Sequence, residues 1–411
     1  MQTPPLPDLP PAQRIATLDT VRGVAVMGIV FLNIVSFAMP EAAYLSPRAY
    51  GLDGPADRWT YYAVFVAFDG KMRGLFSFLF GGSLLLIADR AGDNAAPVHY
   101  RRMAWLLVLG LAHAVLLWSG DILVHYALIG SVAFLFRHHE PWRLVAFGVT
   151  LSVVDLLLMG SIPLSYLTMT AAHTAQAAAS LREFEEGFGV PDPTTIAAQL
   201  ALFRGGFGGI VAHNLNQLAI NLSNTVLIGC ETLAYMVFGM AALRSGMLTG
   251  AWSQRRYLGW AIAGIGLGGG GYALIAAWMA SRDLDTLAIA AGPLVLAIVP
   301  RAIMIAGWAA VLVLLGRAQR PLARRLADVG RMALSNYLAT SIVMCFLFYG
   351  WGLGLFGRFS RAGLYPFVAV MCLAMLLWSP WWLSRFRYGP FEWLWRSLSR
   401  WQVQPIRITT C

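Results

Sequence analysis

Charged residues are scarce in this sequence. Only 12% of the 411 residues are Asp, Glu, Lys or Arg, and 58% are hydrophobic, whereas soluble domains carry about 25% charged residues. The apolar stretches recur from end to end instead of forming one block, which excludes a water-soluble globule with a single core. The composition predicts an all-α fold, a polytopic transmembrane helical bundle.

Lysine and cysteine are also rare. Lys71 is the sole lysine beside 29 arginines, and the net charge of +10 is spread over short loops without a long basic run, which argues against nucleic-acid binding. The four cysteines show neither metal-ligand spacing nor a disulfide pattern: Cys230, Cys345, Cys372 and Cys411. We therefore expect buried or free thiols, no metal site, no tightly bound cofactor and no nucleic-acid partner.

The long apolar segments predict the number of membrane spans. A bilayer core needs roughly 20 apolar residues in a helix. The second segment is longer than this, so we expect it to be tilted, partly outside, or broken near Asp69 and Gly70. We place about ten spans in a transmembrane domain over 21–384, at 21–39, 60–88, 103–118, 121–136, 143–164, 219–243, 257–280, 290–316, 332–350 and 363–384.

The arginines predict the orientation. If the N-terminus lies in the cytoplasm, the predicted inner segments hold 20 arginines and the outer segments hold 7. Cytoplasmic loops are enriched in Lys and Arg, so this split favours an even number of spans with both termini cytoplasmic. We expect a multi-pass protein of the inner-membrane type, whose first partner is the lipid bilayer.

Three segments lie outside the predicted spans. Residues 1–20 are Pro-rich and lack the features of a cleavable signal, which predicts a disordered cytoplasmic lead. Residues 165–218 form a long outer segment with two expected helices, Thr168–Glu186 and Thr194–Arg204, and both an ordered cap and a linker fit it. In the tail, 385–411, aromatic and basic residues alternate after Pro390, which predicts a cytoplasmic interfacial amphipathic helix.

Ionisable residues inside apolar spans are costly, so each is a candidate site. In the first span, Arg22 lies near the cytoplasmic end, and Asn33 follows eleven residues later. Eleven helical steps return to nearly the same face, roughly 16 Å deeper. Arg22 can bind a phosphate or acyl-carrier group, or it can snorkel and pair with Asp19.

The second span holds a further group of charges. Asp69 and Arg73 are four residues apart and can pair on one helix face, with Lys71 between them. These three side chains either line a polar cavity or satisfy one another. Glu231 and Arg301 lie deep in later spans, and because each alone is costly to bury, we expect them to pair.

Two histidines and an aspartate form a third group. His113 lies inside the third span, Asp121 lies at the outer hairpin, and His125 follows Asp121 by four residues, so one helix face can carry both. A carboxylate that orients an imidazole is what general-base catalysis requires. The histidines can equally be buried groups bonded to neighbouring helices. The chain has no P-loop, nucleophile elbow or zincin motif.

Five blocks of the sequence, in order, resemble the YeiB-like family of bacterial membrane proteins, a domain of unknown function. They are LDTVRGVAVMGIVFLN (18–33), KMRGLFSFLFGGS (71–83), the run over 101–130, GRMALSNYL (330–338) and YGPFEWLWR (388–396). The resemblance covers nearly the whole chain and implies a bacterial inner-membrane location. It implies no particular reaction.

The opening of the first span is similar, more distantly, to membrane acyltransferases of the acyltransferase-3 type and to heparan-glucosaminide N-acetyltransferases. That resemblance implies an acyl-CoA donor and an envelope glycan or lipid acceptor, with Arg22 at the donor. The family's catalytic His is absent, because Asn33 stands at one expected position and the loop over 40–59 has no His. His125 or His113, oriented by Asp121, would then act as the base.

Three hypotheses follow from these residues. The first is a membrane acyltransferase, in which Asn33 hydrogen-bonds a reacting group. The second is a transporter or permease, whose polar path would use Asp69, Arg73, His113, Glu231 and Arg301. Transporters often contain two related halves, and no internal repeat of about 200 residues is evident. The third is a non-catalytic membrane protein in which the buried charges serve only packing.

Overall fold

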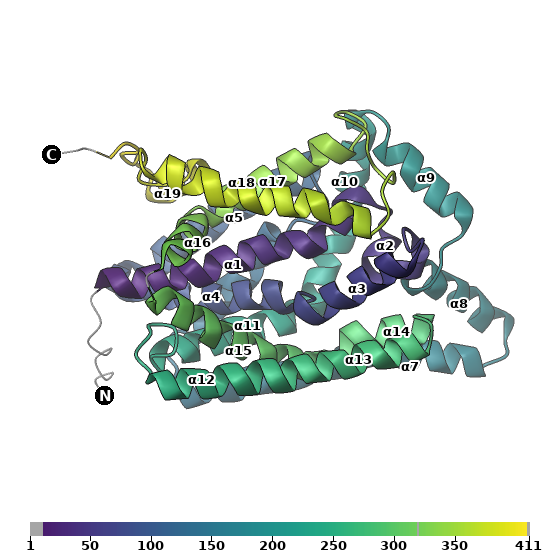
Figure 1. The fold of residues 1–411 in the computed structure, drawn as a ribbon, viewed down its shortest axis with the longest axis horizontal. Helices are drawn as coiled ribbons and strands as arrows, with labels where there is room; N and C mark the ends of the chain where they lie inside the picture. The colour runs from purple at the N-terminus through teal and green to yellow at the C-terminus, as the bar shows by residue number, and fades with distance from the viewer. Residues whose placement is uncertain (1–10, 319, 409–411) are drawn as a thin grey trace.

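The computed structural model describes residues 11–318 and 320–408, with side chains from Thr17 onward. This part of the chain is helical and contains no β-strand, apart from a single bridge between Phe386 and Arg407. The helices run roughly along one axis (Figure 1), and the start of α1 and helix α19 lie at the same end of the bundle. Residues 1–10 of the predicted lead and Cys411 fall outside the described residues, whereas residues 11–20 of the lead belong to helix α1.

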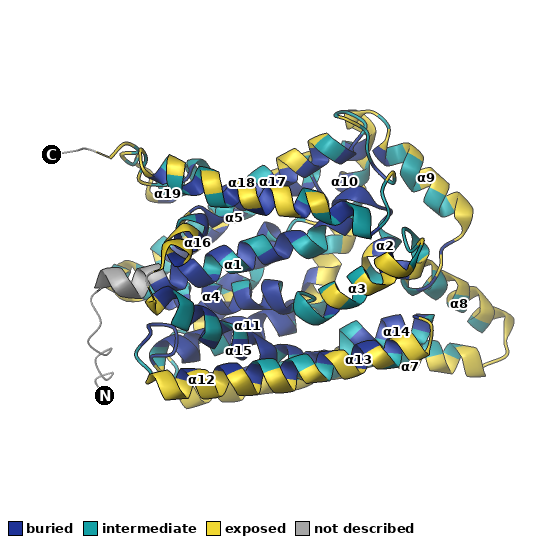
Figure 2. Ribbon diagram, viewed as in Figure 1, coloured by how far each residue is buried: buried dark blue, intermediate teal, exposed yellow. Residues whose placement is uncertain are grey.

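Helix α1 (Pro11–Ala38) runs through the middle of the bundle. It packs against α4, α15, α16 and α17, and its side chains are largely buried (Figure 2). Toward its N-terminal end, α1 approaches α16 so closely that a Cβ on Gly330 would lie 1.9 Å from the Asp19 carbonyl oxygen. A small residue is therefore required at this crossing.

The next helices follow α1 in the chain, and of these α2 and α4 pack against it. They are α2 (Ala42–Leu45), a 3₁₀ turn (Pro47–Ala49), α3 (Pro55–Ala67), α4 (Lys71–Ala91), α5 (Ala95–Leu116) and α6 (Leu123–Ala133), with short 3₁₀ turns at Gly92–Asn94 and Phe134–Phe136. The chain breaks between α3 and α4 at residues 68–70, where Gly70 has a φ of +64°. The expected break near Asp69 and Gly70 is thus present.

The middle of the chain contributes one long outer helix and a bent pair. Helix α7 (Pro141–Ala171) continues past its predicted end. The segment over 165–218 is helical for most of its length. It contains the end of α7, then α8 (Ala175–Phe188), α9 (Pro193–Phe203) and the start of α10 (Phe207–Leu227), which meets α11 (Gly229–Arg244) at a bend of 54°.

The C-terminal half contains two helices interrupted by π-helical turns. These are α12 (Gln254–Ala263) with α13 (Gly269–Ser281) across Gly264–Gly268, and α14 (Thr286–Ala291) with α15 (Ile298–Arg317) across Gly292–Leu296. Helix α16 (Pro321–Arg331) meets α17 (Ala333–Phe348) at 77°. A 3₁₀ turn (Ala362–Leu364), α18 (Tyr365–Leu383) and α19 (Pro390–Arg400) complete the chain.

Helix α19 docks onto the bundle through Glu392. The Glu392 carboxylate accepts hydrogen bonds from the backbone N–H groups of Leu334, at 2.7 Å, and Ser335, at 3.0 Å, and so caps the start of α17. Burial raises the pKa of this carboxyl, and the hydrogen bonds from Ser335 oppose that shift. Trp395 donates to the Arg102 carbonyl at 2.9 Å. The tail helix therefore has a protein-facing side in addition to any membrane-facing one.

The helices are apolar enough to cross a membrane. Six helical stretches meet the length and hydropathy needed, and the two bent pairs raise the number to eight. Only 17% of the most apolar window of α7 is buried, against 61% for α1, so α7 has a lipid-facing character and α1 a core character. The polytopic helical fold is confirmed, whereas the count of ten spans stays a prediction.

Candidate functional site

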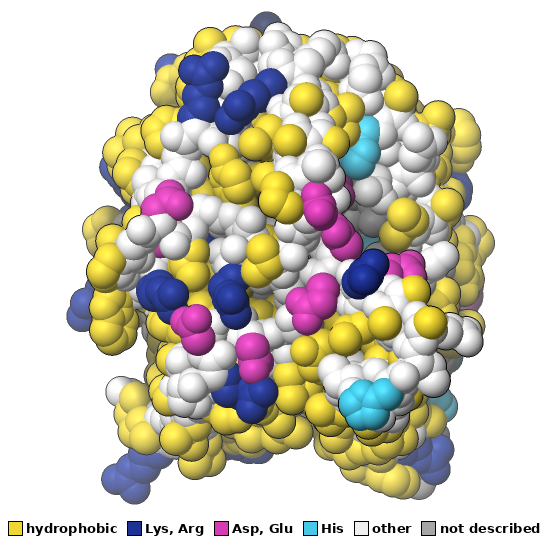
Figure 3. Space-filling model, turned by 90° about the vertical axis from the view of Figure 1, so that its right-hand side faces the viewer, with side chains coloured by type: hydrophobic (Ala, Val, Ile, Leu, Met, Phe, Trp, Pro, Cys, Tyr) yellow, Lys and Arg dark blue, Asp and Glu magenta, His cyan; other side chains and the backbone are white. Residues whose placement is uncertain are grey.

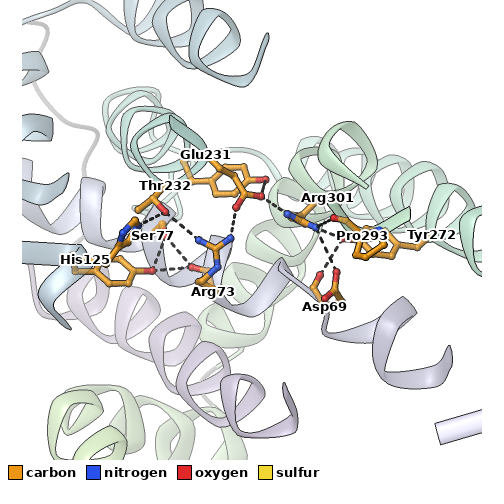
Figure 4. Close-up of polar contacts among 11 residues, drawn as sticks. Asp69, Arg73, Ser77, His125, Glu231, Thr232, Tyr272, Pro293 and Arg301 are labelled. Carbon is orange, nitrogen blue, oxygen red and sulfur yellow. Dashed lines mark hydrogen bonds and ion pairs between the residues drawn. The ribbon is translucent and has the colours of Figure 1, made fainter. Parts of the chain in front are cut away.

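The charges inside the bundle gather around Glu231, at the start of α11. Its two carboxylate oxygens pair with different arginines, Arg73 on α4 and Arg301 on α15, and Figure 4 shows Glu231 between them. The Tyr235 hydroxyl donates to the same carboxylate at 3.1 Å. Because Glu231 is 5% exposed, this carboxylate lies in a low-dielectric interior, where unpaired charge is very costly.

Arg301 spans the distance between Glu231 and the helix breaks. Its Nη2 donates to the Pro293 carbonyl at 2.6 Å, where the π-helical turn frees a backbone oxygen, and lies 3.5 Å from the Asp69 carboxylate. Its Nε donates to the Tyr272 hydroxyl at 3.0 Å. A Cβ at Gly70 would lie 2.2 Å from this Nε, so the break before α4 leaves room for the guanidinium.

Arg73 extends the network toward α6. Its Nη1 donates to the Thr232 hydroxyl at 3.1 Å, and the same oxygen lies 2.8 Å from His125 Nε2. The Arg73 carbonyl accepts from Ser77 and from Tyr126, each at 3.0 Å. The network therefore ties α4, α6 and α11 together as well as α15.

Lys71 binds backbone carbonyl groups at the break between α3 and α4. Its ammonium donates to the carbonyls of Phe65, at 2.9 Å, and Asp69, at 3.0 Å, and lies 3.0 Å from the centre of the Tyr272 ring. In a bilayer, a broken helix is tolerated only where other groups satisfy the freed backbone. Lys71 and Arg301 supply these donors, so the charges are matched to the irregular backbone around them.

The pairing predicted within the second span is wrong. Asp69 does not pair with Arg73, because Asp69 lies in the non-helical break and contacts Arg301, while Arg73 faces Glu231 on another helix. The predicted pair of Glu231 and Arg301 is confirmed. The five charged residues predicted inside these spans, Asp69, Lys71, Arg73, Glu231 and Arg301, therefore belong to one network or to its edge.

His113 and Asp121 form a second buried group, at the hairpin between α5 and α6. His113 Nδ1 lies 2.7 Å from Asp121 Oδ2, and the side chains are 1% and 2% exposed. The other Asp121 oxygen accepts from the Val124 N–H at 2.8 Å and caps α6. Within the described residues, His113 Nε2 has no hydrogen-bond partner. The Tyr337 ring lies beside the imidazole, with 5.2 Å between ring centres.

The predicted pairing of Asp121 with His125 is wrong. Asp121 precedes α6 and turns back toward α5, whereas His125 faces α11 and meets Thr232. Four residues of spacing place two side chains on one face only when both lie within the helix, and Asp121 lies before its first turn. Asp121 therefore orients His113 alone.

Asn33 lies on α1, one helical turn before Phe37. The Phe37 ring packs at a tilt against Trp118, with ring centres 4.2 Å apart. Trp118 follows α5, and its backbone N–H donates to the His113 carbonyl at 3.1 Å. Asn33 is partly buried, and its spacing from Phe37 puts it on the same side of α1 as Trp118.

Arg22 lies at the opposite end of α1, near the chain termini. Its guanidinium pairs with Asp19 at 2.6 Å and donates to Ser83 at 2.9 Å. The Arg22 side chain remains 25% exposed. The charges of Arg331 and Arg396 also act on Asp19. Burial lowers the pKa of the Arg396 guanidinium, and the charges of Arg400 and Arg22 lower it further.

Several members of these groups were not predicted from the sequence. Thr232, Tyr235 and Tyr272 bind the central charges, and Tyr337 lies against His113. Thr232 directly follows Glu231, and Tyr337 lies within the GRMALSNYL block. These positions beside predicted residues were the sequence features that could have identified them. In the described part of the chain, no group of three or more His, Cys, Asp or Glu is placed to hold a metal ion.

Apolar helices around compensated buried charges define a polytopic helical membrane protein. The chain belongs to the YeiB-like family. It is 34% identical over 407 residues to "Uncharacterized protein YeiB" of Escherichia coli (strain K12), with 94% of this chain and 96% of the relative covered. It is 32% identical over 424 residues to "Uncharacterized protein YxaH" of Bacillus subtilis (strain 168), with 96% of each covered.

Two further comparisons complete this picture. Residues 242–402 match the family model described as "Protein of unknown function (DUF418)", which covers the helices from the end of α11 to α19. No solved structure matches the chain. The comparisons therefore identify the family of the chain, and the evidence for a reaction comes from the geometry of the site.

Proposed function

We propose that this protein is a membrane acyltransferase, which moves an acyl group from acyl-CoA to a hydroxyl or amine of an envelope glycan or lipid-linked acceptor. The observation that carries the proposal is the buried pair of His113 and Asp121. Asp121 holds Nδ1 of the imidazole at 2.7 Å, and Nε2 has no partner within the described residues. An imidazole oriented by a carboxylate, with its other nitrogen free of hydrogen bonds, is suited to general-base catalysis once an acceptor reaches that buried nitrogen.

The reaction would use this pair as follows. The acceptor O–H or N–H attacks the thioester carbonyl while His113 Nε2 takes its proton, and Asp121 stabilises the imidazolium. The acyl carbon–sulfur bond then breaks, and the imidazolium returns the proton to the leaving thiolate. The Asn33 amide is the candidate donor to the oxyanion that develops on the carbonyl oxygen.

The donor would bind at the end of α1 that lies near the termini. Arg22 is partly exposed there, and Arg331, Arg396 and Arg400 add positive charge around it. Guanidinium groups are well suited to the phosphates of CoA. The pantetheine arm of CoA would extend along α1 from Arg22 toward Asn33, a distance of roughly 16 Å for eleven helical residues, and would carry the thioester to the His113 side.

The same proposal includes the topology. We propose ten crossings in a bacterial inner membrane, with both termini in the cytoplasm. The stretch Pro55–Leu116 has 62 residues, about 90 Å if straight, so it holds more than one crossing. Its helices α4 and α5 pack against each other across the turn at Gly92–Asn94. The 20-to-7 split of arginines supports the orientation.

The test is calorimetric titration of the full chain, in detergent, with acetyl-CoA and longer acyl-CoAs. Saturable binding is expected, and Arg22→Gln is expected to weaken it at least tenfold while the protein elutes as a single folded species. Arg48→Gln is the matched control, because Arg48 is an exposed arginine at the other end of the bundle. Absence of binding by any acyl-CoA would overturn the donor assignment.

A second candidate, a transporter, is favoured by one specific observation. Three helix breaks meet around the Glu231 network: α3–α4 at Gly70, α10–α11 at Ile228, and the π-helical turn before α15. Broken helices that expose backbone and charge near the membrane midplane are typical of transporter binding sites. Substrate-driven uptake into vesicles that contain the purified protein would support this candidate over acyl transfer.

A further inference from the structure

A small cavity lies at the end of the bundle away from the termini. It has a volume of about 60 Å³ and is enclosed by the second half of α1, by α2 and α3, and by the start of α18. About four water-sized groups fill such a volume. Figure 3 views this end of the molecule, where acidic and basic side chains alternate among hydrophobic ones.

One wall of the cavity carries a carboxylate, Asp69, that can accept further hydrogen bonds. Asp69 lines the cavity, and its side chain is 25% exposed. Within the described residues, the one side chain paired with this carboxylate is Arg301, at 3.5 Å, and that arginine is mainly engaged with Glu231. A charge-assisted hydrogen bond is normally 2.7–2.9 Å long, so the Asp69 carboxylate can still accept from a cation.

The walls beside Asp69 are aromatic. Tyr44, Tyr61, Phe65 and Tyr365 all line the cavity, and the centres of the Tyr61 and Phe65 rings are 6.2 Å apart. Aromatic faces attract ammonium groups, more strongly when water is excluded. A carboxylate within an aromatic enclosure favours an organic cation over a metal ion, which would require several oxygen ligands.

A positively charged residue, Arg361, lines the same cavity as Asp69. Arg361 is 4% exposed, and its Nη2 donates to the Ala43 carbonyl at 2.7 Å. Its Nε has no hydrogen-bond partner within the described residues. The charge of Asp57 acts on Arg361, but the Asp57 oxygens accept the backbone N–H groups of Asp53, Gly54 and Ala362. The Arg361 guanidinium is thus buried without a dedicated carboxylate partner.

We propose that this cavity is a binding site for a small zwitterion, whose ammonium group meets Asp69 and whose carboxylate meets Arg361. Both charges of the ligand are matched, and the aromatic rings enclose its aliphatic part. A molecule with only one charge matches only one of Asp69 and Arg361, so it gains one of the two charge-assisted contacts and is expected to bind more weakly. This inference does not rest on acyl transfer, since the cavity lies on the Leu32 and Val35 side of α1.

The experiment uses a series of ω-amino acids of increasing length as probes: glycine, β-alanine, 4-aminobutyrate and 6-aminohexanoate. Each is titrated into the full chain in lipid nanodiscs, with calorimetric detection. The expected result is saturable binding of at least one length. The alkylamine and the carboxylic acid of the same length are expected to bind at least tenfold more weakly.

Two variants locate the site. Asp69→Asn keeps the side-chain size and is expected to weaken binding of the best probe at least tenfold. Asp283→Asn is the control, because Asp283 is an exposed carboxylate paired with Arg58 at the surface. The proposal is overturned if no ω-amino acid binds saturably, or if the singly charged analogues bind as tightly. If Asp69→Asn does not fold, the analogues still decide between these outcomes.

Discussion

The bundle contains two buried polar groups of opposite character. Around Glu231, each charge has a partner, and the hydrogen bonds connect four helices. At the hairpin between α5 and α6, His113 and Asp121 contact each other, and Nε2 of the imidazole has no partner in the described chain. His125 Nδ1, at the edge of the first group, has no partner there either. The first group joins helices through paired charges, whereas the second holds an imidazole that a carboxylate orients.

The comparison of the two groups shows that burial of a charge does not by itself identify a functional site. A buried charge is expected to be paired in any membrane protein, so the depth of Glu231, Arg73 and Arg301 alone does not identify a site. An unsatisfied buried nitrogen costs free energy, and both His113 and His125 have one. The carboxylate that orients His113 is therefore the feature that distinguishes the hairpin from the Glu231 network. The four predictions below test this contrast, from the largest expected effect to the smallest.

The largest effect is expected at Glu231. The Glu231→Gln change removes the negative charge that both Arg73 and Arg301 contact. Loss of one partner from a buried ion pair costs about 3–5 kcal/mol, so a large drop in thermal stability is expected in detergent. Glu183→Gln, at an exposed glutamate on α8, is the control and should leave the melting temperature unchanged. Equal melting temperatures for the two variants would contradict the structural role.

The next effect concerns the His113 pair. Asp121→Asn keeps an oxygen that can accept from the Val124 N–H but removes the charge that stabilises the imidazolium. Acyl transfer is expected to fall about 10²-fold, with little change in melting temperature. Asp192→Asn is the matched control, because Asp192 caps α9 in the same manner through the Thr194 N–H. Full activity of Asp121→Asn would show that the pair serves packing.

A smaller loss is expected at the break before α4. Gly70 has a φ of +64°, and a Cβ there would lie 2.2 Å from Arg301 Nε. Gly70→Ala should therefore cost about 1–3 kcal/mol of stability through backbone strain and displacement of the guanidinium. Gly54→Ala is the control, since a Cβ at Gly54 meets nothing within 4 Å. Denaturation in detergent compares the two, and equal stability would contradict the close contact.

The smallest effect is expected at Thr232. Its hydroxyl accepts from Arg73 and lies 2.8 Å from His125 Nε2. Thr232→Val should cost about 1–2 kcal/mol of stability and leave acyl-CoA turnover unchanged. Thr225→Val, which removes only a bond to the Asn221 carbonyl on its own helix, should cost less. A loss of turnover in Thr232→Val would move the chemistry from His113 to the Glu231 network.

The sequence predicted the elements and the buried charges better than the contacts between them. Hydropathy identified the helices, and the cost of burying charge led to the pair of Glu231 and Arg301, which is present. Spacing along the chain suggested Asp69 with Arg73 and Asp121 with His125, and both are absent. Spacing reports neighbours on one helix, whereas Asp69 and Asp121 lie in non-helical segments, and the partners of Arg73 and His125 belong to another helix.

The cavity near Arg361 illustrates the same limit. Arg361 counted only as one of seven outer arginines in the sequence. Its burial and its position opposite Asp69 depend on how the start of α18 packs against α1 and α3. No local pattern encodes that arrangement, because residues 69 and 361 are brought together only by the tertiary fold.

The most direct test compares two histidine variants in one assay. Membrane vesicles that contain the full chain are supplied with acetyl-CoA and an envelope lipid extract, and release of free CoA thiol is followed. His113→Gln is expected to lower the rate about 10²–10⁴-fold while acetyl-CoA still binds, and His125→Gln is expected to retain most of the rate. Equal rates for His113→Gln and the unmodified chain would contradict the assignment of His113 as the base.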